Sequence, residues 1–192
     1  DSVDLYLFWA GVLEELQRHD EAFAVYEQGV GRRPDAVELY VFWGFALEEL
    51  ERWSEAIEVY KRGIIATDDD TRLYIRWGIT LGRQERWQEA ISRYMKAAAA
   101  SKADTSRGDA LLHWGIALEK LERWDQAVEI LDEANGLTPD DTLCLFYLGS
   151  CLEQASRAVE DSSYLTRSIE TFKHLIEIDP NDAFALNYLG YM

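Results

Sequence analysis

The chain has 192 residues, of which 48% are hydrophobic and 12% aromatic, and its formal net charge is −17. This apolar content is too high for an intrinsically disordered chain, and the length suffices for a substantial core. The excess of 36 acidic over 19 basic residues repels phosphate backbones and anionic lipid head groups, which argues against nucleic acid and membrane partners. No apolar run approaches the ~20 residues that a membrane span needs, so membrane insertion is not expected. With three prolines and no long glycine or serine tract, helix is the expected secondary structure.

One hexapeptide recurs along the chain, with tryptophan at its centre. It reads ERWSEA at 51–56, ERWQEA at 85–90 and ERWDQA at 122–127, and a degenerate copy, QRHDEA, stands at 17–22. The copies are 34, 34 and 37 residues apart. Spacing this regular predicts a repeat architecture.

Alignment on the hexapeptide brings further positions into register. A small residue occupies one position in six copies: Ala10, Gly44, Gly78, Gly115, Gly149 and Gly190. In the first four copies a tryptophan precedes it. The alanine that ends the hexapeptide stands four residues before a large one: Tyr26, Tyr60, Tyr94 and Leu131. The prolines Pro34, Pro139 and Pro180 fall at the ends of units. Apolar residues recur at intervals of three and four, which predicts helices.

Each unit is therefore predicted to be two antiparallel helices of roughly fourteen residues, joined by a tight turn. Ser54, Asp125 and Asp20 are expected to cap the second helices. The small residues allow the two helices to approach closely, and the aromatic that follows the alanine is expected to fill the gap to the next unit. Trp53, Trp87 and Trp124 are expected in the core, because inter-unit packing demands a stripe at repeat spacing.

These columns resemble the tetratricopeptide repeat, a 34-residue family with small residues, alanine, an aromatic and proline at fixed positions. The resemblance implies an all-α, right-handed α-solenoid that spans 1–192 as one domain. We place repeats at 3–36, 37–70, 71–107, 108–141 and 142–182, followed by a partial or capping helix at 183–192. One departure is regular: Tyr6, Tyr40 and Tyr74 stand where the family has tryptophan, and tryptophan stands three residues later. Repeat five carries Ser168 in place of alanine and an insertion at 155–165, which either lengthens its helices or forms a loop.

The resemblance also implies that the first helix of each repeat lines a concave groove that binds a peptide or a protein. From the groove positions we select twelve candidates: Phe8, Phe42, Phe45, Glu49, Arg72, Arg76, Arg83, His113, Phe146, Tyr147, Tyr188 and Tyr191. Exposed aromatics suit a binding groove because they supply contact area at low entropic cost. In the alternative interpretation the phenylalanines cover one another and Glu48 and Glu49 form a solvated face. The arginines either clamp a carboxylate or neutralise nearby glutamates.

Two features argue against more specific functions. Arg72 and Arg76 match part of the clamp by which some relatives bind chaperone tails, but Leu7, Gly11 and Phe42 stand where that clamp needs lysine and asparagines. Catalytic motifs such as GxSxG, HExxH and a phosphate-binding glycine loop are missing from the sequence. The histidines are scattered, and Cys144 and Cys151 lie too far apart along one helix for a disulfide. We therefore expect neither cofactor, metal site nor enzymatic activity.

The sequence thus predicts a noncatalytic scaffold for protein–protein interaction. The alternatives are self-assembly through the end repeats, giving a homo-oligomer, and a regulatory arm of a larger enzyme. The segment 180–192, PNDAFALNYLGYM, resembles junctions in long bacterial tetratricopeptide adaptors, some of them periplasmic, and the chain begins without methionine, so we expect a piece of a longer bacterial protein. Two free thiols favour the cytoplasm, and a periplasmic location stays open.

Overall fold

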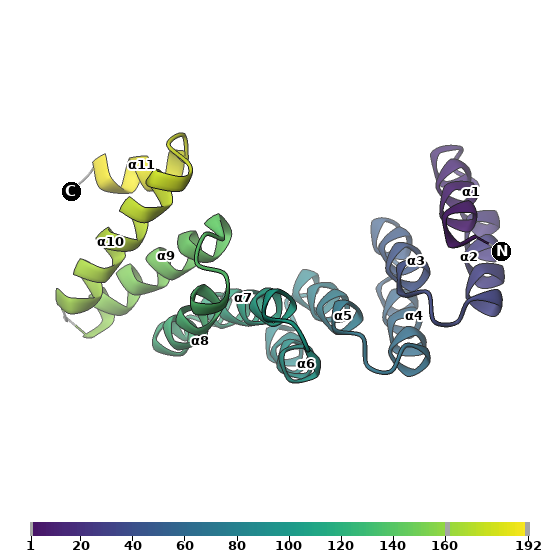
Figure 1. Ribbon diagram of the computed structural model, residues 1–192, viewed down its shortest axis with the longest axis horizontal. Helices are drawn as coiled ribbons and strands as arrows, with labels where there is room; N and C mark the ends of the chain where they lie inside the picture. Colours follow the sequence, from purple (N-terminus) through teal and green to yellow (C-terminus); the bar gives the residue numbers. More distant parts are fainter. Residues whose placement is uncertain (1, 160–161, 191–192) are drawn as a thin grey trace. The chain divides into compact units, whose positions relative to one another are not determined.

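The computed structural model describes residues 2–159 and 162–190, and every regular element within them is a helix. The eleven helices of these residues are α1 Val3–Glu15, α2 His19–Arg32, α3 Val37–Glu49, α4 Trp53–Ala66, α5 Thr71–Arg83, α6 Trp87–Ala100, α7 Asp104–Lys120, α8 Trp124–Leu137, α9 Thr142–Val159, α10 Ser162–Ile178 and α11 Ala183–Gly190 (Figure 1). The predicted all-α class is confirmed. In repeat five the helices are longer, because α9 extends to Val159 and α10 starts at Ser162.

The chain divides into two compact units, Asp1–Ala100 (unit 1) and Ser101–Met192 (unit 2). Within each, helices that are consecutive in sequence pack together, as a solenoid requires. The first helices of successive repeats also contact one another: α1 with α3 and α3 with α5 in unit 1, and α7 with α9 in unit 2. Second helices show no comparably extensive contact in the described residues. The first helices therefore line the inner face of each unit, and the second helices line its outer face.

The two helices of a repeat are held together by a ring or branched side chain that lies over a glycine. A Cβ atom added to Gly44 would lie 2.2 Å from the Tyr60 ring, and one added to Gly78 would lie 2.3 Å from Tyr94. Leu131 covers Gly115 in the same way, and Phe172 covers Gly149. The sequence predicts that these side chains fill the gap to the next repeat, but their close contact is with the glycine of their own repeat. Tyr26 also reaches the next repeat, where it stacks on Trp43 with ring centroids 6.4 Å apart.

The hexapeptide forms the turn between the two helices of a repeat. Its first residue has a left-handed backbone in all four copies, with φ of 59°, 56°, 60° and 56° at Gln17, Glu51, Glu85 and Glu122. In the second copy the Glu51 amide donates to the Glu48 carbonyl and the Arg52 amide donates to the Leu47 carbonyl, each at 2.9 Å. These are the two bonds of a Schellman motif, which ends one helix by satisfying its last carbonyls.

The predicted caps at Asp20, Ser54 and Asp125 are wrong, because the second helices begin two residues earlier than those caps imply. The N-cap positions are occupied by Arg18, Arg52 and Arg123, none of which makes a side-chain cap hydrogen bond. Arg52 instead holds both carboxylate oxygens of Glu55, at 2.7 and 2.6 Å. The carboxylate is thereby fixed in the first helical turn, where the helix dipole favours negative charge.

The hexapeptide tryptophans are half-buried, so the expectation that they belong to the core is only partly met. Trp87 packs back across its turn, and its indole would lie 2.7 Å from a Cβ atom on Gly82. The fully buried side chains are instead the alanine and large-residue columns, together with the leucines that close each first helix, such as Leu81 and Leu118.

Replacing Gly44 with alanine is predicted to destabilise the protein by about 1–3 kcal/mol, because the new methyl group would collide with the buried Tyr60 ring. Gly11 is the matched control: it lies within α1, and a Cβ atom there meets nothing within 4 Å. Gly11→Ala should stabilise by about 0.5–1 kcal/mol through the gain in helix propensity. Urea denaturation of both variants measures the difference, and equal effects would contradict this account of the interface.

The cysteine thiols are predicted to be inert in the folded protein. Cys144 and Cys151 are free and fully buried, and burial raises the pKa of each thiol to about 12. Because the thiolate is the reactive form, Ellman's reagent should label neither cysteine near neutral pH until a denaturant unfolds the chain. Since folding favours the protonated thiols, the free energy of unfolding should decline as the pH rises above about 9. Labelling of the native protein at the unfolded rate would contradict this prediction.

Candidate functional site: two inner faces

The inner face of unit 1 exposes aromatic rings. Phe8 lies on α1, and Phe42 and Phe45 lie on α3; all three side chains are exposed, so they do not cover one another as the alternative interpretation assumed. The neighbouring Glu49 is exposed as well. An aromatic strip bordered by charge is the composition that an interaction surface needs.

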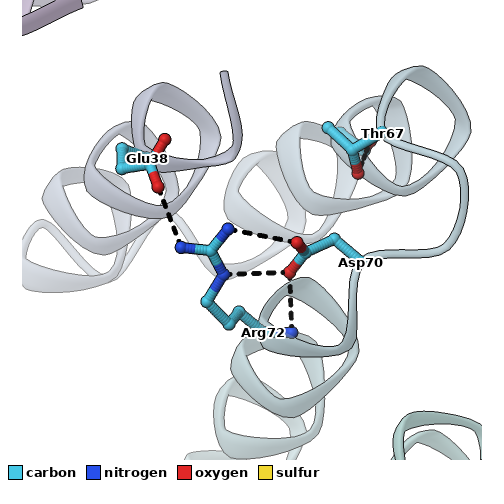
Figure 2. A network of polar contacts seen from close by, with 5 residues as sticks. Glu38, Thr67, Asp70 and Arg72 are labelled. Atoms are coloured by element: carbon cyan, nitrogen blue, oxygen red, sulfur yellow. Dashed lines mark hydrogen bonds and ion pairs between the residues drawn. The ribbon is translucent and has the colours of Figure 1, made fainter. Parts of the chain in front are cut away.

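Arg72, the first of the predicted arginines, is already occupied. Its guanidinium binds Asp70 through Nε and Nη2, each at 3.1 Å, and reaches across to Glu38 of α3 with Nη1 at 2.8 Å (Figure 2). Asp70 also accepts from the Arg72 amide at 2.9 Å, which makes it the N-cap of α5. Asp68 and Asp69, both with a left-handed backbone, form the turn that precedes this cap. Arg72 therefore ties α5 to α3, in keeping with the neutralising role rather than the clamping one.

Arg83 belongs to a buried polar network. Its Nη1 lies 3.3 Å from Glu48 Oε2 and 3.5 Å from Glu49 Oε1. Glu48 is only 1% exposed, so its predicted place on a solvated face is wrong. Its Oε1 accepts hydrogen bonds from Tyr60 at 2.7 Å and from Thr80 at 2.6 Å. One carboxylate thus links α3, α4 and α5.

Arg76 differs from the other two arginines. It lies half-buried on α5, and within the part of the chain that the structure describes its guanidinium has neither a hydrogen-bond partner nor an ion pair. It is therefore the cation of the predicted set that is available to an incoming carboxylate.

Unit 2 contains a hollow of about 510 Å³ on its inner face. Two of its lining residues, Phe146 and Tyr188, belong to the twelve candidates selected from the sequence. The other six were not selected: Ser150, Glu153, Phe184 and Asn187 stand at groove positions of the repeat register on α9 and α11, whereas Phe172 and Arg157 do not. Phe172 occupies the large-residue column of repeat five, four residues after Ser168, and this signal could have found it. Arg157 lies in the insertion, where the repeat register provides no guide.

The walls of this hollow are aromatic. The Phe146 ring lies 5.4 Å from that of Phe184, and the Phe172 ring lies 4.4 Å from that of Tyr188, centroid to centroid. Ser168, fully buried, donates to the Gly149 carbonyl at 2.8 Å, and its Oγ lies 3.2 Å from the Tyr188 hydroxyl. This bond fixes Tyr188, and burial raises the pKa of its hydroxyl, so the ring stays neutral at physiological pH.

The rim of the hollow carries one ion pair, between Glu153 and Arg157, one turn apart on α9. The Glu153 side chain is largely covered, whereas that of Arg157 is mostly exposed. A ligand can therefore displace Arg157 toward solvent and meet the carboxylate beneath it.

The remaining predicted residues are placed less centrally. Tyr147 lies against Phe146 in an edge-on contact at 5.2 Å and does not line the hollow. His113 is half-buried on α7 and is not free. Tyr191 lies outside the described residues.

The described residues hold no group of three or more histidine, cysteine, aspartate or glutamate side chains that could bind a metal ion. None of the helices in the described ranges is both long enough and apolar enough to cross a bilayer.

Comparisons with known proteins agree with this architecture. Among curated proteins no sequence match was found. Solved structures with similar folds include MamA (residues 41 to the end) from Desulfovibrio magneticus RS-1, with a TM-score of 0.68, 18% identity, and coverage of 95% of this chain and 98% of that one. A second is YrrB, described as a TPR protein with an unusual peptide-binding site, with a TM-score of 0.66, 19% identity and coverage of 96% and 90%. A third is PilF from Pseudomonas aeruginosa, with a TM-score of 0.66, 15% identity and coverage of 97% and 88%.

At these identities the structural likeness shows the fold alone. The sequence model of the tetratricopeptide repeat matches residues 6–71 and 75–142, which is more than half of the chain. The protein therefore belongs to the tetratricopeptide repeat family.

Proposed function

We propose that this protein is a noncatalytic scaffold that binds an extended segment of a partner protein on the inner face of unit 2. Tetratricopeptide repeat proteins are generally scaffolds for protein–protein interaction, and YrrB, a structural neighbour, is described as having a peptide-binding site. The observation that carries the proposal is the hollow between α9 and α11. It is lined by residues at inner-face positions and has a volume in the range of ligand pockets.

The chemistry of the hollow supports a partner of a particular kind. Phe146, Phe184 and Tyr188 offer apolar walls for one large side chain, and Asn187 and Ser150 offer hydrogen bonds to the peptide backbone. Glu153 supplies a carboxylate, and the net charge of −17 attracts positively charged partners over longer distances. We therefore propose a segment that carries an aromatic or large aliphatic residue next to lysine or arginine.

Peptides that bind the purified chain, selected from a random library, should be enriched in this pattern. Fluorescence anisotropy of a selected peptide should show about 10-fold weaker binding to Phe184→Ala, because that ring is 69% exposed and its loss removes contact area without opening the core. Ile65→Ala is the matched control, since Ile65 is equally apolar and exposed but lies at the end of α4 on the other unit. Circular dichroism checks that both variants retain their helices.

A second set of variants separates the two inner faces. Phe42→Ala, Phe45→Ala and Arg76→Glu together remove the two exposed rings of α3 and the unpaired cation of α5 from the inner face of unit 1. If this triple variant loses binding while Phe184→Ala retains it, the site lies on unit 1 and the proposal for unit 2 is wrong.

A specific observation also favours self-association. An apolar stripe runs along α1 and its C-cap residue at spacings of four, three and four residues: Leu5, Trp9, Val12 and Leu16. The residue equivalent to Trp9 in the next repeat is Trp43, which is 8% exposed because it packs on repeat one, whereas Trp9 is 47% exposed. We propose that a second copy covers this stripe with its last described helix, α11, on which Leu186 is exposed.

Light scattering over a concentration series tests this second function. The mass is expected to rise with concentration, and Leu5→Glu with Leu16→Glu should abolish the rise because two charges would be desolvated in the contact. Ile65→Glu, which charges an exposed apolar position elsewhere, should leave the association unchanged. A constant monomeric mass would exclude self-association of this chain.

A further inference from the structure

Two hollows occupy the outer side of unit 1, at successive repeat junctions. The first, about 350 Å³, is built on Trp43 and Phe23, and the second, about 300 Å³, on Trp77 and Ile57. Their main lining residues are related by the 34-residue repeat, since Trp77 follows Trp43 and Ile57 follows Phe23 at that interval. The first hollow therefore serves as an internal reference for the second.

The charges of the first hollow are balanced. Arg52 is held by Glu55 at 2.7 and 2.6 Å, and Arg62 stacks over Trp43 at 5.3 Å while it faces Glu27 at 3.8 Å. Glu58 is the remaining lining charge and pairs with Lys61 at 2.6 Å. Every basic side chain that lines the first hollow thus has an acidic neighbour.

The second hollow has one cation in excess. Its Lys61 is paired with Glu58, and Arg86 takes both oxygens of Glu89, at 2.7 and 2.8 Å. Arg93 remains. At the equivalent place the first hollow has the apolar Val59, one repeat earlier.

The Arg93 guanidinium lies over an aromatic ring and, in the described residues, forms no ion pair. Glu89, one turn earlier on α6, is bound to Arg86, and the pKa of its carboxyl is lowered by that hydrogen bond and also by the nearby charge of Arg93. The Arg93 Cζ atom lies 4.0 Å from the centre of the Trp77 ring, which is a close cation–π contact, and Lys61 Nζ lies 5.4 Å from the same ring. In the described ranges of the chain Arg93 has neither a hydrogen bond nor an ion pair, and its Nε is buried without a hydrogen-bond partner. This is unusual in a chain with 36 acidic and 19 basic residues, where ten other arginines of the described residues are paired with carboxylates.

A guanidinium that is stacked on an indole keeps its N–H groups in one plane, and this planar fork matches the two oxygens of a carboxylate. Ile57 and Leu81 also line the hollow, but both side chains are buried, so the accessible apolar surface comes mainly from the half-buried Trp77 ring. The site therefore combines one unpaired planar cation, a second cation nearby and an apolar floor.

We propose that the second outer hollow is a binding site for a carboxylate that is carried by a peptide next to an apolar side chain. The Arg93 fork receives the carboxylate, Trp77 supports the guanidinium, and the apolar side chain lies against the accessible part of the Trp77 ring. This site is separate from the hollow in unit 2, so the chain can engage an acidic segment on one unit and a basic, aromatic segment on the other.

The test uses N-acetyl-Glu-Leu-amide, which has one carboxylate, and N-acetyl-Gln-Leu-amide, which has none. NMR spectra of the isotope-labelled chain should show saturable shifts of the Trp77 indole N–H with the glutamyl peptide at about 10 mM, and at least about tenfold weaker binding of the glutaminyl peptide. Inorganic phosphate is the third probe. If phosphate binds and the glutamyl peptide does not, the site takes free oxyanions and the proposal is wrong.

Arg93→Gln should abolish the shifts, whereas Arg62→Gln, which changes the arginine that lies over Trp43 at the first hollow, should preserve them. Arg93→Lys keeps the charge and the aliphatic stem but lacks the planar fork. It should therefore bind the glutamyl peptide more weakly than the wild type and more tightly than Arg93→Gln. If the glutamine variant loses helicity, the lysine variant provides the comparison with the wild type. Equal binding by Arg93→Gln and the wild type would overturn the proposal, as would the lack of saturable shifts.

Discussion

The contact on which the structure depends is the one between a bare backbone and a large side chain inside each repeat. The glycine in the middle of the first helix, which follows tryptophan in repeats two to four and Leu148 in repeat five, leaves room that Tyr60, Tyr94, Leu131 and Phe172 occupy in successive repeats. Because the ring lies directly on the opposite helix, it fixes both the spacing and the rotation of the pair. The inner and outer faces follow from that rotation, since it decides which positions of the first helix remain available to a ligand.

The hexapeptide turn and the buried Glu48 carboxylate fix the direction in which the second helix and the next repeat continue. The left-handed residue at the start of the hexapeptide ends one helix within two residues, so the second helix returns directly along the first. Glu48 then links its own repeat to the next through Tyr60 and Thr80. A buried carboxylate that serves three helices depends on all of them, because removal of one partner leaves a charge or a hydroxyl unsatisfied.

The repeat columns were predictable from the sequence because each records a contact that recurs at a fixed interval. Glu48 was not, since its burial depends on Thr80, which lies one repeat away and has no counterpart in the other repeats. The caps failed for a different reason: residue type favoured Ser54, but the preceding Schellman motif had already set the helix start at Trp53. For the site, the register correctly placed Phe146 and Tyr188 at one hollow. The solitary Arg93 was missed because only its distance to Trp77 and its lack of a partner distinguish it.

The position of α11 has a consequence for the dynamics of unit 2. This eight-residue helix packs on α10, and its Phe184 and Tyr188 form one wall of the inner hollow. Among the described helices of unit 2, α11 is the shortest and packs chiefly on α10, so its order depends on few contacts. A peptide that touches both α9 and α11 would add contacts that hold this helix in place. Ligand occupancy would then be coupled to helix order, and slower amide exchange in α11 would report the bound state.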